Sequence, residues 1–351
     1  MTDKLAVGRL ALVEFSGPDP KALGQVLEGI GMTAVAKRRG REAVLYRQGG
    51  INFVVNTDAS SYAAGFGARH GPSITGLAIP VDDPVAVQRI AIERGARAFR
   101  GGAEPLVPGP LTLGVGDSLL YLVPKGADLF GDFEPLPGVD QHPAGFGFTH
   151  IDHVTHCVPV PEMKYWVDFY QAIFGFSIVF EFEAKGRASG FHTQAVRDDD
   201  MNVCVTILEP TTPESQIQEF MDQYHGAGVQ HVAIASNDLY HSVARMVDAG
   251  TPFLTTPASY YEMIDARMPG HGENLAELMR LSLLLDGTTA AQSPDGQEHL
   301  LLQIFTKKVV GPIFFEAIQR KANYGFGEGN AQALFDAIER EQIARGAIPS
   351  A

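Results

Sequence analysis

The sequence predicts an α+β fold in which a βαβββ pattern is repeated, so that strands dominate and helices cover one face of each sheet. Three observations predict it. An apolar, strand-like run followed by an amphipathic helix occurs twice in each half of the chain. Each of these helices ends next to a glycine. The chain has 351 residues, of which 45% are hydrophobic, and on a prior of ~150 residues per domain this allows about two domains with sizeable cores.

In the first half, two strand–helix pairs are predicted. Leu10 to Phe15 is the first strand-like run, and Pro20 to Ile30 follows with helical spacing. Ser73 to Ile79 is the second run, followed by a helix over Val85–Arg94 that ends before Gly95. Proline at the start of a helix and glycine just past its end are the usual boundaries of a helix.

The second half repeats this order. Ile151 to Val158 is predicted as a strand, and Pro161 to Phe174 as an amphipathic helix that stops at Gly175. Further on, Val229–Ala235 is predicted as a strand and Leu239–Asp248 as a helix. The chain is therefore expected to contain two related halves, each made of two modules.

Composition excludes several classes of function. The net charge is −14, with the acidic residues spread along the chain, which argues against a nucleic-acid-binding surface and for a protein that handles small molecules. Cys157 and Cys204 are the only cysteines, too few for a disulfide framework, so a reducing cytoplasm is the expected location. No apolar run approaches ~18 residues, so neither a signal peptide nor a membrane span is expected.

Three β-prone runs each contain one side chain that can bind a metal. They are His153 in Ile-Asp-His-Val, His231 in Gly-Val-Gln-His-Val-Ala and Glu316 in Phe-Phe-Glu-Ala-Ile-Gln-Arg. Two histidines and one carboxylate with open coordination positions are typical of non-heme Fe(II) oxygenases. The three residues lie far apart along the chain and must come from separate strands. His156 lies three residues after His153, which places it on the opposite face of the strand and outside the predicted site.

The predicted domains follow from these features. Residues 1–130 form an N-terminal domain without metal, 131–148 a linker within a Gly-, Pro- and Asp-rich stretch, and 149–351 the catalytic domain with a closing C-terminal helix. Aligning the halves places His153 opposite Glu14 and His231 opposite Gly76. The first half then lacks a complete ligand set and is expected to serve packing and oligomerisation.

Several motifs resemble those of the 4-hydroxyphenylpyruvate dioxygenases. They are Leu45–Asn52, Gly228–Ala233, Leu300–Lys307, Phe314–Arg320 and Gly325–Asn330, in the same order over nearly the whole chain. The resemblance implies two vicinal-oxygen-chelate domains, the second a half-open barrel around Fe(II). It also implies that His153, His231 and Glu316 hold the iron.

The resemblance implies the chemistry as well. In the family, a small aryl 2-oxo acid binds Fe(II) through its carboxylate and keto oxygens, leaves one position for O2, and loses CO2. Because the 2-oxo acid is part of the substrate, no separate 2-oxo acid is needed. Family members are commonly homodimers or homotetramers.

The resemblance further implies a substrate pocket. Three glutamines, Gln216, Gln230 and Gln303, correspond to pocket amides, and Gln230 and Gln303 are also expected to act in catalysis; amides donate and accept hydrogen bonds without adding charge. The remaining pocket positions are a threonine, two aromatic walls, and residues of the loop and closing helix: Thr193, Phe305, Phe326, Asn330, Leu334 and Phe335.

Three pocket positions differ from the homogentisate-forming enzymes. Thr206 and Leu208 stand where that group usually has proline and asparagine, and Ala331 replaces a phenylalanine. The related 4-hydroxymandelate synthases, which use the same substrate and iron but hydroxylate the benzylic carbon, are similar at these positions. The rest of the framework is closer to the homogentisate-forming enzymes. Homogentisate is therefore the expected product and 4-hydroxymandelate, or the product of another 2-oxo acid, the alternative.

Two other classes of function remain on the same scaffold. One is a binding protein of the drug-resistance type, which usually lacks metal ligands. The other is a glyoxalase-type isomerase, which uses four protein ligands. Bound metal would distinguish them: iron for the oxygenase, zinc or nickel for the isomerase, and none for the binding protein.

Overall fold

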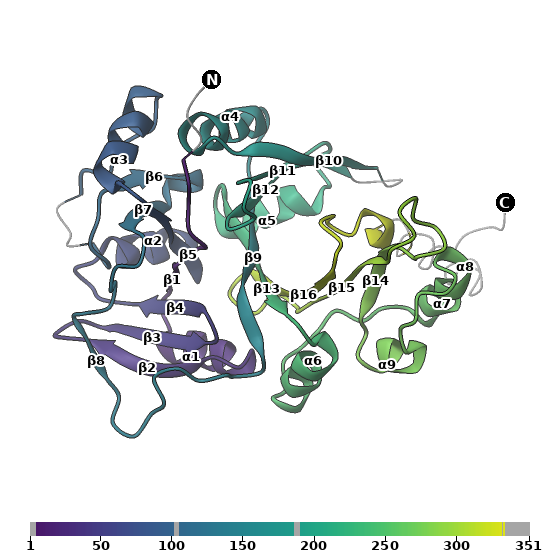
Figure 1. Cartoon of the computed structure of the whole chain (residues 1–351). Helices are drawn as coiled ribbons and strands as arrows, with labels where there is room; N and C mark the ends of the chain where they lie inside the picture. Colours follow the sequence, from purple (N-terminus) through teal and green to yellow (C-terminus); the bar gives the residue numbers. More distant parts are fainter. Residues whose placement is uncertain (1–4, 102–104, 186–189, 332, 334–351) are drawn as a thin grey trace.

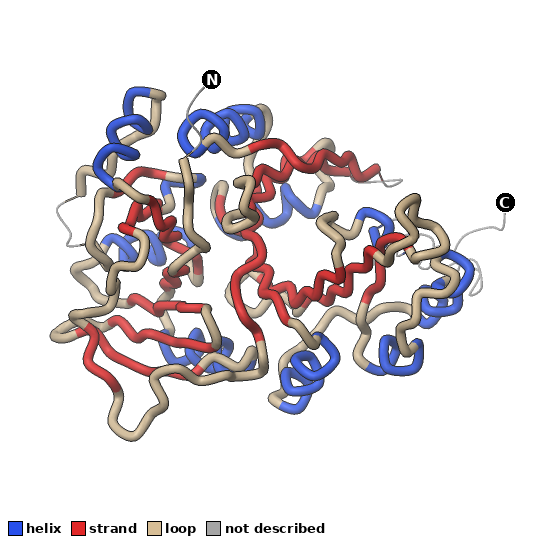
Figure 2. Tube along the Cα trace, viewed as in Figure 1, coloured by secondary structure: helices blue, strands red, loops and turns tan. Residues whose placement is uncertain are grey.

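The computed structural model describes residues 5–101, 105–185, 190–331 and 333. Two eight-stranded sheets lie side by side, one from each half of the chain, and helices pack against them (Figures 1 and 2). The second sheet curls strongly into a half-barrel, so that β10–β12 and β14–β16 extend from opposite sides of β9 and β13 (Figure 1). The predicted α+β fold with two related halves is confirmed.

The first sheet has the strand order β6-β7-β5-β1-β4-β3-β2-β8. β8 lies within the predicted linker and pairs with β2, so this segment extends the first sheet. The strands are β1 (Leu12–Ser16), β2 (Thr33–Arg38), β3 (Ala43–Gln48), β4 (Ile51–Asn56), β5 (Ser73–Val81), β6 (Leu111–Leu113), β7 (Leu119–Pro124) and β8 (Phe133–Pro135).

The second sheet has the order β10-β11-β12-β9-β13-β16-β15-β14. In both sheets the two modules meet through an antiparallel pair, β1 with β5 and β9 with β13. The first strand of each module pairs in parallel with the last strand of the same module. The strands are β9 (Phe148–Cys157), β10 (Ser177–Lys185), β11 (Gly190–Arg197), β12 (Cys204–Pro210), β13 (Gly228–Ser236), β14 (Leu284–Thr288), β15 (His299–Phe305) and β16 (Phe314–Lys321).

The four helices that the sequence predicts begin and end within one residue of their predicted bounds. Asp19 and Asp83 accept hydrogen bonds from backbone N–H groups in the first turns of α1 and α3, each just before a proline at the helix start. α4 ends at Gly175, whose φ of 72° is left-handed. The helices are α1 (Pro20–Gly29), α2 (Tyr62–His70), α3 (Pro84–Glu93), α4 (Glu162–Phe174), α5 (Gln216–Tyr224), α6 (Leu239–Asp248), α7 (Ala258–Glu262), α8 (Ile264–Arg267) and α9 (Leu275–Arg280), with a 3₁₀ turn at Val115–Asp117. No helix in the described part of the chain is long and apolar enough to cross a membrane.

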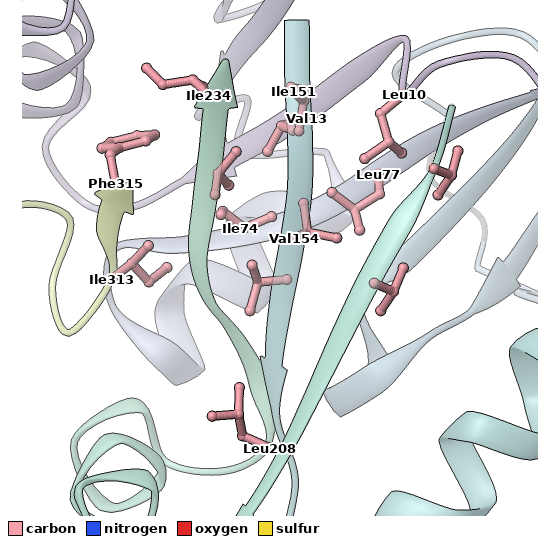
Figure 3. Packing of buried hydrophobic residues seen from close by; sticks show 14 of the residues in the cluster. Leu10, Val13, Ile74, Leu77, Ile151, Val154, Leu208, Ile234, Ile313 and Phe315 are labelled. Atoms are coloured by element: carbon pink, nitrogen blue, oxygen red, sulfur yellow. The ribbon is translucent and has the colours of Figure 1, made fainter. Parts of the chain in front are cut away.

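One hydrophobic core joins the two halves. Side chains of β1 and β5, such as Val13 and Ile74, pack close to Val154 and Ile234 of β9 and β13 (Figure 3). Phe315 of β16 lies with its ring centroid 6.2 Å from that of Phe15. The face of each sheet that carries these residues is thus buried against the other sheet. The opposite face of β9, β13 and β16 is left for a site.

The predicted alignment of the two halves is wrong by two residues. Gly76 pairs with Glu14, whereas His231 pairs with Thr155 and Ala233 with His153. A shift of two residues leaves each side chain on the same face of its strand, so the alternation of apolar residues cannot detect it.

In the corrected alignment, the positions of His153, His231 and Glu316 are occupied in the first half by Leu12, Gly76 and Tyr121. The Tyr121 hydroxyl donates to Glu14 Oε2 at 2.8 Å. Burial raises the pKa of Glu14 despite hydrogen bonds from Asn56 and Tyr121. None of the three equivalent positions offers an imidazole or a carboxylate.

His156 lies on the buried back of β9, as predicted. Its Nε2 is 3.3 Å from the Tyr170 hydroxyl, while its Nδ1 is buried without a hydrogen-bond partner in the described chain. Burial lowers the pKa of His156 from 6.5 to about 3. The folded chain therefore keeps this imidazole neutral down to acid pH.

We predict that His156 makes the fold sensitive to acid. The unfolded chain takes up a proton here near pH 6.5 and the folded chain only near pH 3, so the free energy of unfolding falls as the pH drops through this window, by about 1.4 kcal/mol per pH unit. His156→Phe, which introduces the residue type found at the equivalent Phe15, should flatten this fall. Urea unfolding of the metal-free protein across the window measures it. His241→Gln, at an exposed position of α6, is the control, and an equally steep fall in His156→Phe would contradict the prediction.

Candidate metal centre

The pairing of three strands brings the three predicted ligands together. β9 runs antiparallel to β13 with His153 opposite Ala233, and β16 runs parallel to β13 with Glu316 beside the same Ala233. His231 lies two residues before Ala233 and therefore on the same face of the sheet. The ligand atoms of His153, His231 and Glu316 therefore meet on this face, all within 4.8 Å of one another.

The ligand atoms converge on one carboxylate oxygen. Glu316 Oε2 lies 3.4 Å from His153 Nε2 and 3.6 Å from His231 Nε2. His153 and Glu316 are buried, and His231 is nearly so. This is the one group of three or more such residues in the described chain with ligand atoms within 4.8 Å of one another.

The donor set fits a metal ion. Metal–nitrogen bonds of about 2.1 Å place donors at right angles about 3 Å apart, close to the separations seen here. Two imidazoles and one carboxylate on one side of an ion leave several coordination positions open, the arrangement of non-heme Fe(II) oxygenases.

The pKa values of the two imidazoles are shifted in opposite directions. Burial lowers the pKa of His153, but hydrogen bonds to Asp152 and Glu316 outweigh it and raise the pKa to about 9. Burial and the neighbouring His153 hold the pKa of His231 well below its usual value. In the metal-free protein His153 therefore carries a proton that a metal must displace, whereas His231 is already neutral.

A buried ion pair holds His153 in place. Asp152 Oδ1 lies 2.8 Å from His153 Nδ1, which leaves Nε2 directed at Glu316. Arg320 donates to both oxygens of Asp152, at 2.7 and 2.8 Å. Burial alone would raise the pKa of Asp152, but the hydrogen bonds from Arg320 and His153 bring it far below its usual range. Carboxylate partners of this kind fix the tautomer of metal-binding histidines.

A chain of hydrogen bonds holds the other oxygen of Glu316. Gln303 Nε2 donates to Glu316 Oε1 at 3.1 Å, and Asn330 Nδ2 donates to Gln303 Oε1 at 2.8 Å. The Tyr260 hydroxyl donates to Asn330 Oδ1 at 2.6 Å and accepts from Arg267 at 3.0 Å. Every bond in this chain donates toward the carboxylate, so Oε1 is occupied and Oε2 faces the two histidines.

Aromatic rings lie close to the cluster. The ring centroid of Phe326 lies 5.5 Å from that of His153 and 5.0 Å from that of Phe180. Phe305 pairs with Glu316 across β15 and β16, and its ring lies 6.1 Å from that of Phe314, which stacks on His231.

Two hydroxyl groups on the same face are buried without partners. Thr206 Oγ1 on β12 and Thr193 Oγ1 on β11 have no hydrogen-bond partner in the described chain. Thr206 pairs with Thr155, whose hydroxyl lies 2.9 Å from His231 Nε2, and Thr193 pairs with Leu208. Buried polar atoms without partners leave hydrogen-bonding capacity for a ligand on this face.

The loop of residues 325–330 packs directly against Gln303. Gly327 has a φ of 80°, and a Cβ there would lie 1.8 Å from Gln303 Oε1, so only glycine permits this approach. The Ala331 N–H donates to the Gly327 carbonyl at 3.1 Å, which starts a helical turn after the loop. Leu334 and Phe335 of the predicted closing helix lie outside the described residues.

Two of the three predicted glutamines lie at the cluster. Gln303 is bonded to Glu316, and Gln230 Oε1 lies 3.1 Å from His231 Nδ1. Gln216 is exposed on the first turn of α5, and no hydrogen bond of the described chain links it to the cluster. Its side chain follows the capping residue Ser215 and points away from the buried face of the helix formed by Ile217 and Phe220.

Comparisons with known proteins agree with this geometry. Residues 3–135 match the family model for the N-terminal domain of hydroxyphenylpyruvate dioxygenase, and residues 150–263 match that of the glyoxalase/bleomycin resistance protein/dioxygenase superfamily. The chain is 40% identical to a 4-hydroxyphenylpyruvate dioxygenase of Pseudomonas sp. (strain P.J. 874) over 96% of this chain and 95% of that protein.

The chain belongs to the 4-hydroxyphenylpyruvate dioxygenase family.

Other relatives support this assignment. A 4-hydroxyphenylpyruvate dioxygenase of Legionella pneumophila (strain Corby) is 38% identical over 96% of this chain and 95% of that protein. Among solved structures, a mutant of 4-hydroxymandelate synthase from Streptomyces coelicolor superposes with a TM-score of 0.79 and 27% identity, over 96% of this chain and all of that one. The chain is thus a dioxygenase-type enzyme with vicinal-oxygen-chelate domains, and its family implies a metal cofactor.

Sequence reasoning missed the residues that orient the ligands of this dioxygenase. Asp152 and Arg320 lie inside the Ile-Asp-His and Phe-Phe-Glu-Ala-Ile-Gln-Arg motifs, and their opposite charges in apolar strands were the available signal. Tyr260 and Arg267 lie in α7 and α8, outside any strand motif, and only the folded chain shows their link to Asn330.

We predict that Asp152→Asn weakens metal binding about 10- to 100-fold, because His153 loses the carboxylate that fixes its tautomer. Titration of the metal-free protein with Fe(II) under anaerobic conditions measures the affinity. Asp168→Asn, which removes an exposed carboxylate on α4, is the control. Unchanged affinity in a folded Asp152→Asn protein would show that the pair does not orient His153.

Proposed function

We propose that this enzyme is an Fe(II)-dependent dioxygenase that converts 4-hydroxyphenylpyruvate and O2 to homogentisate and CO2. The single observation that supports it most is the convergence of His153, His231 and Glu316 in a chain 40% identical to a 4-hydroxyphenylpyruvate dioxygenase. Fe(II) held by these three residues would supply the coordination positions and the redox chemistry that a 2-oxo acid and O2 require.

The surrounding residues then have distinct roles. Gln303 holds Glu316 so that one carboxylate oxygen remains available, and Gln230 neighbours the Nδ1 of His231. The rings of Phe305 and Phe326 limit access of water to the site, which strengthens electrostatic interactions within it. The hydroxyls of Thr193 and Thr206, which have no partner in the described chain, are available to a substrate oxygen.

The test is direct. The enzyme is loaded with Fe(II) without oxygen, 4-hydroxyphenylpyruvate and O2 are added, and the product is identified by chromatography and mass. Homogentisate with release of CO2 is expected. His231→Ala should keep its fold and lose both metal and turnover, and near-normal turnover by that variant would refute the ligand assignment. An iron-loaded enzyme that does not consume 4-hydroxyphenylpyruvate would refute the substrate.

Two observations favour an alternative product of the same substrate. The chain superposes on a mutant of 4-hydroxymandelate synthase over 96% of its own length. Leu208 is buried within β12, where an amide would offer a hydrogen bond to a phenol, and Ala331 is small. The alternative function is therefore benzylic hydroxylation of the same substrate to 4-hydroxymandelate.

We predict that Leu208→Asn combined with Ala331→Phe shifts the product ratio toward homogentisate if the natural enzyme forms 4-hydroxymandelate. A buried phenol hydroxyl without a partner costs about 1–3 kcal/mol, so a restored partner should change the ratio by about fivefold or more. Product ratios measured by mass, with the exposed Leu254→Asn as control, test this. An unchanged ratio would mean that these positions do not direct the outcome.

A further inference from the structure

A cavity of about 200 Å³ is lined in part by Phe326, whose ring centroid lies 5.5 Å from that of His153 in the metal centre. It is bounded by β9, β11 and β16 of the second sheet and by Arg9 from the segment before β1. Asn202 donates to the carbonyl of Val7 at 3.1 Å, which ties this segment to the turn before β12. The cavity therefore lies where the two halves meet and opens to solvent.

The cavity is cationic in a strongly acidic chain. Arg9, Arg197 and Arg320 line it against the single carboxylate of Asp152, whereas the whole chain has a net charge of −14. Arg320 already has hydrogen-bond partners, because it donates to both carboxylate oxygens of Asp152 and to the carbonyls of Asn323 and Gly325.

The other two guanidinium groups have no ion pair with any described residue. Arg197 stacks over the ring of Tyr324 at 5.8 Å, and its Nε is buried without a hydrogen-bond partner in the described chain. Arg9 is exposed at the rim. A buried guanidinium N–H that lacks an acceptor is costly. An anion bound in the cavity would give Arg197 and Arg9 the charged partner that they lack.

The positive field reaches a neighbouring group in the cavity wall. Burial lowers the pKa of His150, the charges of Arg9 and Arg320 lower it further, and only Asp152 opposes them. His150 is thus kept neutral, and the excess positive charge belongs to Arg9 and Arg197.

Much of the remaining lining is apolar, and Ser236 and Asn237 add polar groups to it. Met201 and Tyr324 border the cavity, and both are among the large apolar side chains that the described chain leaves exposed. Cys204 and Phe326 form buried or partly buried parts of the wall. A volume of about 200 Å³ is far more than one water needs, and it suits one aromatic ring with a short acidic arm.

We propose that this cavity is a second binding site, separate from the metal centre, for a small aromatic carboxylate whose carboxylate is held by Arg197 and Arg9 and whose ring lies against Tyr324 and Met201. A planar guanidinium matches a carboxylate in a two-bond fork, which a simple point charge does not. The site does not depend on the identity of the bound metal or on the proposed reaction.

The test is calorimetric titration of the metal-free enzyme with phenylacetate. Metal-free protein is used because a carboxylate then has no metal to bind at the other site. Wild-type protein should bind phenylacetate, and Arg197→Gln should weaken binding about tenfold, since charge-assisted hydrogen bonds contribute at least that factor. Arg197→Lys should fall between the two, because it keeps the charge and loses the fork.

Matched controls separate this site from general charge effects. Arg89→Gln removes an exposed guanidinium on α3 and should leave binding unchanged. Arg9→Gln, at an exposed position, should weaken binding without any effect on the fold, which thermal unfolding checks for all variants. Acetate and inorganic phosphate should bind at least fivefold more weakly than phenylacetate.

Three outcomes would overturn the proposal. They are no binding of phenylacetate by the wild-type enzyme, equal binding by Arg197→Gln, Arg9→Gln and Arg89→Gln, or acetate and phosphate binding as tightly as phenylacetate. The last of these would leave a simple anion site with no preference for an aromatic ring.

Discussion

The site depends on the antiparallel pairing of β9 with β13. This pair joins the two modules of the second sheet, and its register puts His153 opposite Ala233 and His231 two residues away on the same face. The parallel pairing of β16 with β13 then adds Glu316 to the same row. A shift of one residue in either pairing would turn a ligand to the apolar back of the sheet, where the two halves pack on each other. The register of these central strands thus positions the ligands.

Each ligand is also fixed through its second polar atom. Asp152 holds Nδ1 of His153, Gln230 Oε1 lies 3.1 Å from Nδ1 of His231, and Gln303 donates to Oε1 of Glu316. Buried charges are costly unless they are paired and hydrogen-bonded, and here each pair has its partners in place before a metal binds. The structure is therefore arranged so that Nε2 of both histidines and one carboxylate oxygen face a common point.

The sequence was sufficient for the first strand and first helix of each of the four modules and for the three central residues. Apolar alternation and helix boundaries identified strands such as β13 and helices such as α6, because burial on one face leaves a clear period in the sequence. The site residues with a strong local signal, such as Glu316 in an apolar run, were found in the same way.

The rest required the fold. The alignment of Glu14 with His153 was wrong by two residues, since strand period cannot detect an even shift. Tyr260 lies far from Gln303 in the chain and contributes through Asn330, a relation that no local pattern encodes. Gln216 shares its residue type with the buried glutamines but lies on an exposed helix turn.

The most direct test of this account is a crystal structure of the enzyme loaded with Fe(II) under anaerobic conditions, with anomalous scattering recorded at the iron edge. The account predicts one strong peak bonded to His153 Nε2, His231 Nε2 and Glu316, with Asp152 still on His153 Nδ1. A fully loaded enzyme with its iron bound elsewhere, or with one of these three side chains turned away from it, would contradict the account.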